Sequence, residues 1–364
     1  HEIMTEFGFW TLERVLDHFE TQPTLRIGCY VDGVLEYHAI TRKDVTISTR
    51  MHDLVEMQNM SANGVSVVPT SNHRMYMSVG PAAAWTADQQ PEFKIHTAGS
   101  VLEQGQADAS VEAQFIARFP QGASVAREQL PFVKALGLCS DDETDAFLEL
   151  YGSWLRNGWL DMDAKTVAFG AADGAQDARL DALFGRLGHA LTGDKAVPTL
   201  TKSSQLVYTV AKPEWFMYFS SECSEKSAVS EESNDENVVP EQLSSKNRRV
   251  ATYLSNWMLE RVSARRLQLI ARGLSVESTE DAGTIAVSSA RLRDDIQRLL
   301  LHAGYSAHFT SSRPSQWNLY YSTSASDATP KLSVQADCKP LRRDCTVWCV
   351  TVPTAEQLIM VRRV

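Results

Sequence analysis

The feature that most constrains the fold is a change of hydrophobic period that occurs twice along the chain. Residues 1–100 carry short apolar alternations, such as LRIGCYVDGVLEYHAI, which are typical of β-strands. From about residue 127 the apolar spacing becomes helical, and beyond about residue 316 alternation returns in WNLYYSTS and CTVWCVTV. A β-rich segment at each end predicts that the two ends fold together into one domain, which the middle of the chain interrupts.

The middle of the chain repeats one arrangement. A helix that ends at Gly158 is followed by the strand KTVAFG and the helix ARLDALFGRLG, and later RRLQLIARGLSVES is followed by GTIAVSS and a helix that starts at Ser288 or Ser289 and ends at Gly304. Between the copies, residues 220–247 are rich in Ser, Glu and Asn, which predicts a mobile linker.

These patterns predict a mixed fold with three segments. The two halves of the β domain are expected at residues 1–126 and 316–364, and the inserted α/β domain at 127–315. The inserted domain is expected to be pseudo-symmetric, with copies at about 140–219 and 250–315.

Composition limits the classes of function. The net charge of -10 repels phosphate, so any contact with nucleic acid requires a local basic face. No apolar run reaches the roughly 18 residues that a membrane helix needs, and residues 1–20 lack the order of a signal peptide. We therefore expect an intracellular protein with no membrane partner.

Six cysteines are too few and too scattered in 364 residues for a disulfide framework. Cys338, Cys345 and Cys349 cluster, but a C-x6-C-x3-C spacing fits no common zinc site. Because Cys349 lies in the apolar stretch VWCVTV, a buried strand thiol is favoured over a metal ligand.

Several segments together resemble a known family. IMTEFGFWTLERV, VVPTSNHRMYM and VWCVTVPTAEQLIMVRR resemble the splicing domain of inteins, and LYGSWLRNGWLD and LIARGLSVEST look like the two helices of a LAGLIDADG homing endonuclease. The order of these pieces carries the resemblance, since none of them is specific alone. The last block is most similar to inteins in large subunits of eukaryotic nuclear RNA polymerases.

The resemblance implies an all-β, horseshoe-like Hint splicing domain interrupted by a LAGLIDADG domain. Its activity would be self-excision with ligation of the flanking extein segments in cis, by a monomer that needs no cofactor for splicing and that follows its host to nucleus or cytosol. The family begins with Cys or Ser and ends with His-Asn or Gly-Asn, whereas this sequence runs from His1 to Val364. We therefore expect junction residues beyond both ends.

The same resemblance assigns the splicing residues. In PTSNHR, Thr70 and His73 match the pair that binds the upstream scissile peptide, with His73 donating to the amide nitrogen and Thr70 orienting it. Cys349 matches a position where many inteins carry Asp, and its thiol could act as a local acid or transient nucleophile. From the residues alone, His73 could equally be an ordinary turn histidine.

In the endonuclease family, one acid at the foot of each helix holds Mg²⁺. Counting five residues on from Gly152 and Gly273 places these acids at Asn157 and Ser278, and neither residue is acidic. Glu277 could substitute only after a one-residue shift. We therefore predict that cleavage is lost and that Mg²⁺ matters only if the endonuclease is active.

Basic residues in the second copy could still contact double-stranded DNA, or could be solvated helix faces paired with acids. The candidates are Arg265, Arg266, Arg291 and Arg293. Two other functions stay open at this point: a site-specific DNA endonuclease, and a non-catalytic interaction module.

Overall fold

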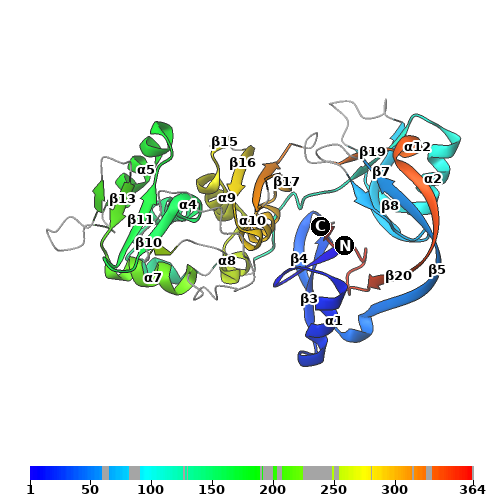
Figure 1. The fold of residues 1–364 in the computed structure, drawn as a ribbon, viewed down its shortest axis with the longest axis horizontal. Helices are drawn as coiled ribbons and strands as arrows, with labels where there is room; N and C mark the ends of the chain where they lie inside the picture. The colour runs from blue at the N-terminus through cyan, green and yellow to red at the C-terminus, as the bar shows by residue number, and fades with distance from the viewer. Residues whose placement is uncertain are drawn as a thin grey trace. The chain divides into compact units, whose positions relative to one another are not determined.

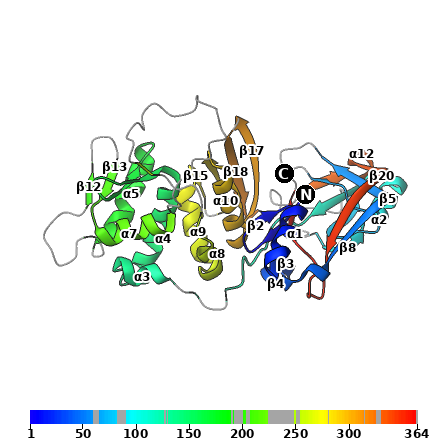
Figure 2. The same cartoon turned by 60° about the horizontal axis from the view of Figure 1, so that its bottom comes forward.

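The protein is mixed α/β, with several antiparallel sheets, and its chain divides into two compact units (Figures 1 and 2). The computed structural model describes residues 1–59, 65–81, 91–125, 128, 130–188, 191, 200–202, 207–223, 248–249, 254–279, 281–313, 315–324 and 330–362. Unit 1 comprises His1–Ser124, Gly304–Thr310 and Tyr321–Val364, and unit 2 comprises Val125–Ala303 and Ser311–Tyr320. Within the described residues, no helix is long and apolar enough to cross a membrane.

Unit 1 consists mainly of strands. Its elements are β1 (Glu2–Thr5), β2 (Gly8–Trp10), α1 (Leu12–Thr21), β3 (Leu25–Val31), β4 (Val34–Ile40), β5 (Val45–Gln58), β6 (Ser66–Val67), β7 (Arg74–Pro81), β8 (Lys94–Thr97), α2 (Ala98–Ala107), β9 (Val111–Phe115), β19 (Lys331–Ser333), α12 (Val334–Asp337), β20 (Cys338–Val350) and β21 (Val361–Arg362). They form three sheets, in the orders β2-β1-β3-β4 with β21 beside β1, β19-β9-β7-β8, and β20-β5-β6.

The turn between β3 and β4 follows directly from its sequence. Asp32 and Gly33 both have positive φ angles, of 48° and 88°, and Val31 pairs with Val34 across them. A two-residue turn of this kind requires left-handed backbone at both positions, which Asp and Gly adopt at low cost. The hairpin that Asp-Gly predicts is therefore confirmed.

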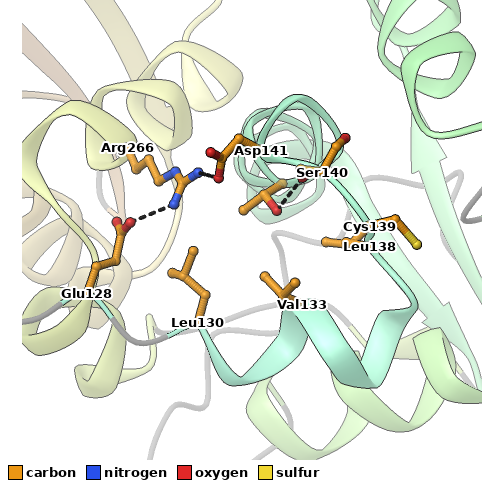
Figure 3. A pocket seen from close by; sticks show the side chains of 9 residues that line it. Glu128, Leu130, Val133, Leu138, Cys139, Ser140, Asp141 and Arg266 are labelled. Atoms are coloured by element: carbon orange, nitrogen blue, oxygen red, sulfur yellow. Dashed lines mark hydrogen bonds and ion pairs between the residues drawn. The ribbon is translucent and has the colours of Figure 1, made fainter.

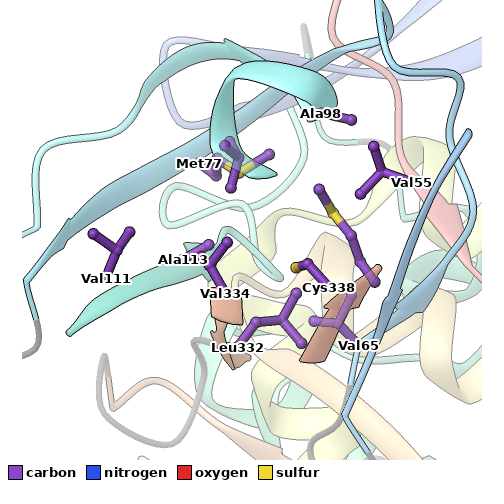
Figure 4. Close-up of a cluster of buried hydrophobic side chains, with 11 residues drawn as sticks. Val55, Val65, Met77, Ala98, Val111, Ala113, Leu332, Val334 and Cys338 are labelled. Carbon is purple, nitrogen blue, oxygen red and sulfur yellow. The ribbon is translucent and has the colours of Figure 1, made fainter. Parts of the chain in front are cut away.

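The longest pairing in unit 1 joins segments from opposite ends of the chain. β5 and β20 run antiparallel from Val45–Val350 to Met57–Cys338. Each end of this ribbon enters an apolar core: Val45 and Val350 lie in a cluster with β1 and β3, and Met57 and Cys338 lie in the cluster of Figure 4. The β-rich ends of the chain thus build one unit.

Unit 2 repeats one topology. Its elements are α3 (Pro131–Leu136), α4 (Asp141–Asn157), β10 (Gly158–Asp161), β11 (Thr166–Gly170), α5 (Gly174–Arg186), β12 (Leu200–Lys202), β13 (Val207–Val210), α7 (Pro213–Cys223), β14 (Arg248–Arg249), α8 (Asn256–Arg261), α9 (Ala264–Leu274), β15 (Glu277–Ser278), β16 (Ala282–Val287), α10 (Ala290–His302), β17 (Ser306–Arg313) and β18 (Gln316–Ser322); β17 and β18 run through both units. After both α4 and α9 the described elements run strand, strand, helix, strand, strand, and both sheets place these strands in the order first, second, fourth, third.

Helices α4 and α9 pack so closely that only glycine fits at their contact. A Cβ on Gly152 would lie 2.2 Å from the carbonyl oxygen of Ile270, and a Cβ on Gly273 would lie 1.9 Å from that of Glu149. Helix α4 begins where its sequence predicts, because the Ser140 side chain accepts from the Glu143 amide while Glu143 accepts from the Ser140 amide. The two helices therefore meet backbone to backbone at these glycines.

The start of the predicted linker is helical instead. Helix α7 extends to Cys223, so the first four residues of the predicted mobile segment 220–247 belong to a helix, and residues 224–247 lie outside the described residues. The apolar residues Trp215 and Phe219 are fully buried on this helix and hold it against the domain. Composition alone missed this helical end, because residues 220–223 continue a helix whose buried residues, such as Phe219, precede the polar segment.

Candidate functional site

The first and last described strands form one antiparallel pair. Glu2 pairs with Arg362 and Ile3 with Val361, and the Arg362 Nε atom lies 2.8 Å from Glu2 Oε2. The Met360 amide donates to the Gly28 carbonyl at 3.1 Å, which ties β21 to β3 as well. Because the pair is antiparallel, the start of β1 and the end of β21 lie at the same end of it, near the N and C marks in Figure 1.

Thr70 and His73 lie in one tight turn before β7. The His73 amide donates to the Thr70 carbonyl at 2.9 Å, and the His73 carbonyl accepts from the Ala98 amide at 3.1 Å. Thr70 also bridges Leu54 on β5. The turn is therefore held between β5 and the start of α2, but among the described contacts no hydrogen bond joins the two side chains.

Desolvation lowers the pKa of the His73 ring below its ordinary value of 6.5 and so favours the neutral imidazole, although the residue as a whole is exposed. A neutral imidazole donates from one nitrogen and accepts at the other, so at pH 7 it can donate a hydrogen bond to an amide without carrying charge.

Cys349 is exposed on β20, so the favoured interpretation of a buried strand thiol is wrong for this residue. Partial desolvation nevertheless raises the pKa of its thiol, which is protonated at neutral pH. Its partner on β5 is Thr46, whereas Thr70 bridges Leu54, eight residues further along β5. At about 3.3 Å per residue these two pairs lie about 26 Å apart along the strand, and none of the described contacts joins Cys349 to the His73 turn.

The other two clustered cysteines have different environments. Cys338 is buried in the core of Figure 4, and burial raises its pKa to about 11, while Cys345 is half-buried on β20. Residues 338 and 345 also lie at odd separation on one strand, so their side chains point to opposite faces.

Sequence patterns missed an aromatic contact near the chain ends. The Tyr30 amide donates to the Leu358 carbonyl at 3.1 Å, next to β21, and the Tyr30 ring lies 5.5 Å from the ring of Tyr76. Tyr76 follows His73 by three residues on β7. Tyr30 therefore connects the paired chain ends to the strand that begins at the His73 turn, and no motif in the sequence indicates this long-range pair.

The feet of α4 and α9, meaning their C-terminal ends, carry amides and a guanidinium. Asn157 Nδ2 and Arg156 Nη2 both donate to Gln176 Oε1 at 3.4 Å, and Arg156 Nη1 donates to the Ser275 carbonyl at 2.8 Å. Ser278 is exposed on β15, and the Glu277 side chain lies outside the described residues. Sequence reasoning placed Asn157 here and missed Arg156 and Gln176.

These residues do not fit a Mg²⁺ ion. Hard divalent cations need several oxygen ligands, usually with carboxylates among them, whereas the described ligands offer an amide, a hydroxyl and a neighbouring cation. Within the described residues, no group of three or more His, Cys, Asp or Glu side chains could hold a metal. No step of a reaction is therefore assigned to a metal at the helix feet.

Two of the residues predicted to contact DNA, Arg265 and Arg266, lie at the start of α9, and Arg266 is engaged in ion pairs. Arg266 lies 2.5 Å from Glu128, 2.6 Å from Asp141 and 2.8 Å from Asp145, beside the pocket of Figure 3. Desolvation opposes its charged form, yet these carboxylates outweigh it and raise the pKa of Arg266. Arg265 is exposed, with Asp145 at 3.4 Å.

The other two candidates lie at the start of α10. The Arg293 side chain is mostly buried, pairs with Asp294 at 2.7 Å and lies over the Trp317 ring at 5.0 Å, while Arg291 is exposed. Three of the four arginines are paired with acids, but only Arg265 among them is solvated, since the Arg266 and Arg293 side chains are mostly buried. DNA contact stays a prediction for all four.

No family model matches this chain, and no curated protein sequence matches it. Function is therefore inferred from the geometry of the paired chain ends, the Thr70–His73 turn and the helix feet.

Proposed function

We propose that this chain is an autocatalytic protein-splicing element, an intein, whose inserted LAGLIDADG-type domain no longer cleaves DNA. Unit 1 would be the Hint splicing domain and unit 2 the endonuclease relic. Flanking protein segments in cis would be the substrates, and a cofactor is not needed.

The observation that carries this proposal is the antiparallel pairing of Glu2 with Arg362. Splicing ligates the upstream protein segment to the downstream one, so the two junctions must meet. The antiparallel register puts the start of β1 and the end of β21 at the same end of the strand pair, where both flanking segments would attach. A fold in general does not require its chain ends to be neighbours, whereas the splicing reaction does.

The Thr70–His73 turn supplies the group that the first step needs. A backbone amide resists attack unless its nitrogen is polarised, and a histidine within hydrogen-bond reach can do so. The lowered pKa of His73 keeps the ring neutral, so it acts as a hydrogen-bond donor first and takes part in proton transfer as the amide bond breaks. Tyr30 and Tyr76 link this turn to the chain ends. The part played by Cys349 stays a prediction.

Unit 2 supports the second half of the proposal. The repeated topology and the glycine contact of α4 with α9 are what a LAGLIDADG pair needs. Asn157 and Ser278 are neutral where the resemblance expects acids, and the cation Arg156 lies where a metal ion would be expected. Cleavage of DNA is therefore the less favoured function, although residual binding to double-stranded DNA is compatible with Arg265 and Arg291.

A splicing assay tests the proposal. The chain is placed between two reporter proteins, with Cys supplied at the upstream junction and a strand ending in His-Asn-Cys supplied downstream, and ligated product is identified by mass. We expect ligation with the wild-type chain, its loss with His73→Ala, and its retention with His38→Ala, a half-buried control paired with Glu36 on β4. A folded chain that gives neither ligation nor junction cleavage refutes the proposal.

A further inference from the structure

We propose that Arg156 is a built-in cation that joins the feet of α4 and α9 and keeps a divalent metal out of that position. The inference concerns unit 2 alone and does not depend on splicing. In this proposal the Arg156 side chain occupies the place between the two helix ends that a bound metal would otherwise take.

The position calls for positive charge. Helices α4 and α9 end side by side, and the carbonyl groups of a last turn carry a partial negative charge. Arg156 lies in the last turn of α4, and its Nη1 donates at 2.8 Å to the carbonyl of Ser275, the residue that caps α9. One guanidinium therefore stabilises both helix ends at once.

A second contact closes the cluster. Gln176 Oε1 accepts from the Ala172 amide at 2.8 Å, and from Arg156 Nη2 and Asn157 Nδ2 at 3.4 Å each. Gln176 is itself fixed, because its backbone N–H donates to Asp173 Oδ1 at 2.8 Å at the start of α5. The feet of the helices are thus tied to the loop between β11 and α5.

Charge at this cluster disfavours a metal ion. Burial lowers the pKa of Arg156, but the charge of nearby Asp173 opposes the loss of its proton, so the guanidinium stays charged. A divalent ion placed next to it would meet like charge in a partly desolvated site. A carboxylate introduced at Asn157 would pair with Arg156 rather than with metal.

The test uses the full chain and Mn²⁺ as the probe, with free Mn²⁺ counted by electron paramagnetic resonance. We expect at most weak Mn²⁺ binding by the wild type and by the double variant Asn157→Asp/Ser278→Asp. Adding Arg156→Ala to the double variant should lower the dissociation constant for Mn²⁺ at least about tenfold, which is about 1.4 kcal/mol. Equal binding by the double and triple variants overturns the proposal, as does a folded triple variant that gains no site.

A stability measurement keeps the proposal testable if the triple variant does not fold. We expect Arg156→Ala to lower the melting temperature of the full chain by about 4 °C, because the Ser275 carbonyl loses its charged donor. Arg186→Ala is the matched control, since Arg186 forms an exposed ion pair with Asp142 in the first turn of α4, at the opposite end of the helix. Equal losses in the two variants, or a wild type destabilised by EDTA, would contradict the assigned role.

Discussion

The glycine contact between α4 and α9 yields the sharpest prediction. In Gly273→Ala the new Cβ would lie 1.9 Å from the Glu149 carbonyl oxygen and 2.9 Å from the Ser153 amide nitrogen. Ordinary contacts with a Cβ begin near 3.4 Å, and the obstacle is backbone, so the helices must separate by about 1.5 Å. Overpacking of this kind costs about 3 kcal/mol, and the better helix propensity of Ala returns about 1 kcal/mol.

The net expectation is a loss of about 2 kcal/mol in the free energy of unfolding, or about 4–8 °C in melting temperature for a domain of this size. Urea and thermal unfolding of the full chain measure it, followed by near-ultraviolet circular dichroism because Trp154 is buried on α4. Gly185→Ala on α5 is the matched control, since nothing lies within 4 Å of its new Cβ and propensity alone predicts a gain of about 1 kcal/mol. If Gly273→Ala is as stable as Gly185→Ala, the close packing is refuted.

Three further changes test other parts of the structure. Full burial lowers the pKa of His302 from 6.5 to about 3, so only the unfolded chain binds this proton as the pH falls below 6.5. We therefore expect the free energy of unfolding to fall by about 2 kcal/mol between pH 7 and pH 5, and His302→Gln to remove that loss in urea titrations at the two pH values. Arg266→Ala leaves the partly buried carboxylates of Glu128 and Asp145 without this cation and is expected to cost about 3 kcal/mol, against less than 0.5 kcal/mol for the exposed Arg265→Ala. Equal costs in urea unfolding would show that the ion pairs of Arg266 contribute nothing. Tyr30→Ala is expected to slow thiol-induced cleavage at the upstream junction at least about tenfold, because it removes the ring that contacts Tyr76, whereas Tyr30→Phe keeps this ring and should retain the rate. A stable Tyr30→Ala variant with the normal rate would refute the proposed link between Tyr30 and the His73 turn.

Local chemistry was readable from the sequence where a few neighbouring residues decide the structure. Asp32-Gly33 fixes a hairpin because both residues accept positive φ, and Ser140 with Glu143 fixes a helix start because each satisfies the amide of the other. Ser289 caps α10 in the same way by accepting from the Leu292 amide. In each case the energy that selects the structure lies within four residues.

Features that depend on distant partners were not readable. Alternation in VWCVTV indicates a strand but cannot say which face is covered: Val350 is buried in the core, whereas its neighbour Cys349 lies on the opposite face of β20 and is exposed. Likewise, the clasp of Arg156 with Gln176 and Ser275 joins residues up to 119 positions apart. Counting five residues from a glycine finds a helix foot but not the side chains that other elements bring to it.

The way in which unit 1 closes fits the proposal that unit 2 has lost an activity while unit 1 keeps its own. Strands β9 and β19 pair antiparallel, with Ala113 opposite Leu332, and the Phe115 amide donates to the Pro330 carbonyl at 3.0 Å. The chain therefore leaves this sheet and returns to it on adjacent strands, as happens at a hairpin loop, and a connection of any length satisfies the same hydrogen bonds. The ribbon of β5 and β20 then completes the unit from residues that lie outside the insertion. The proposed replacement of acids by Asn157 and Ser278 at the helix feet is compatible with this closure, because the described contacts of the paired chain ends and of the His73 turn come from residues of unit 1.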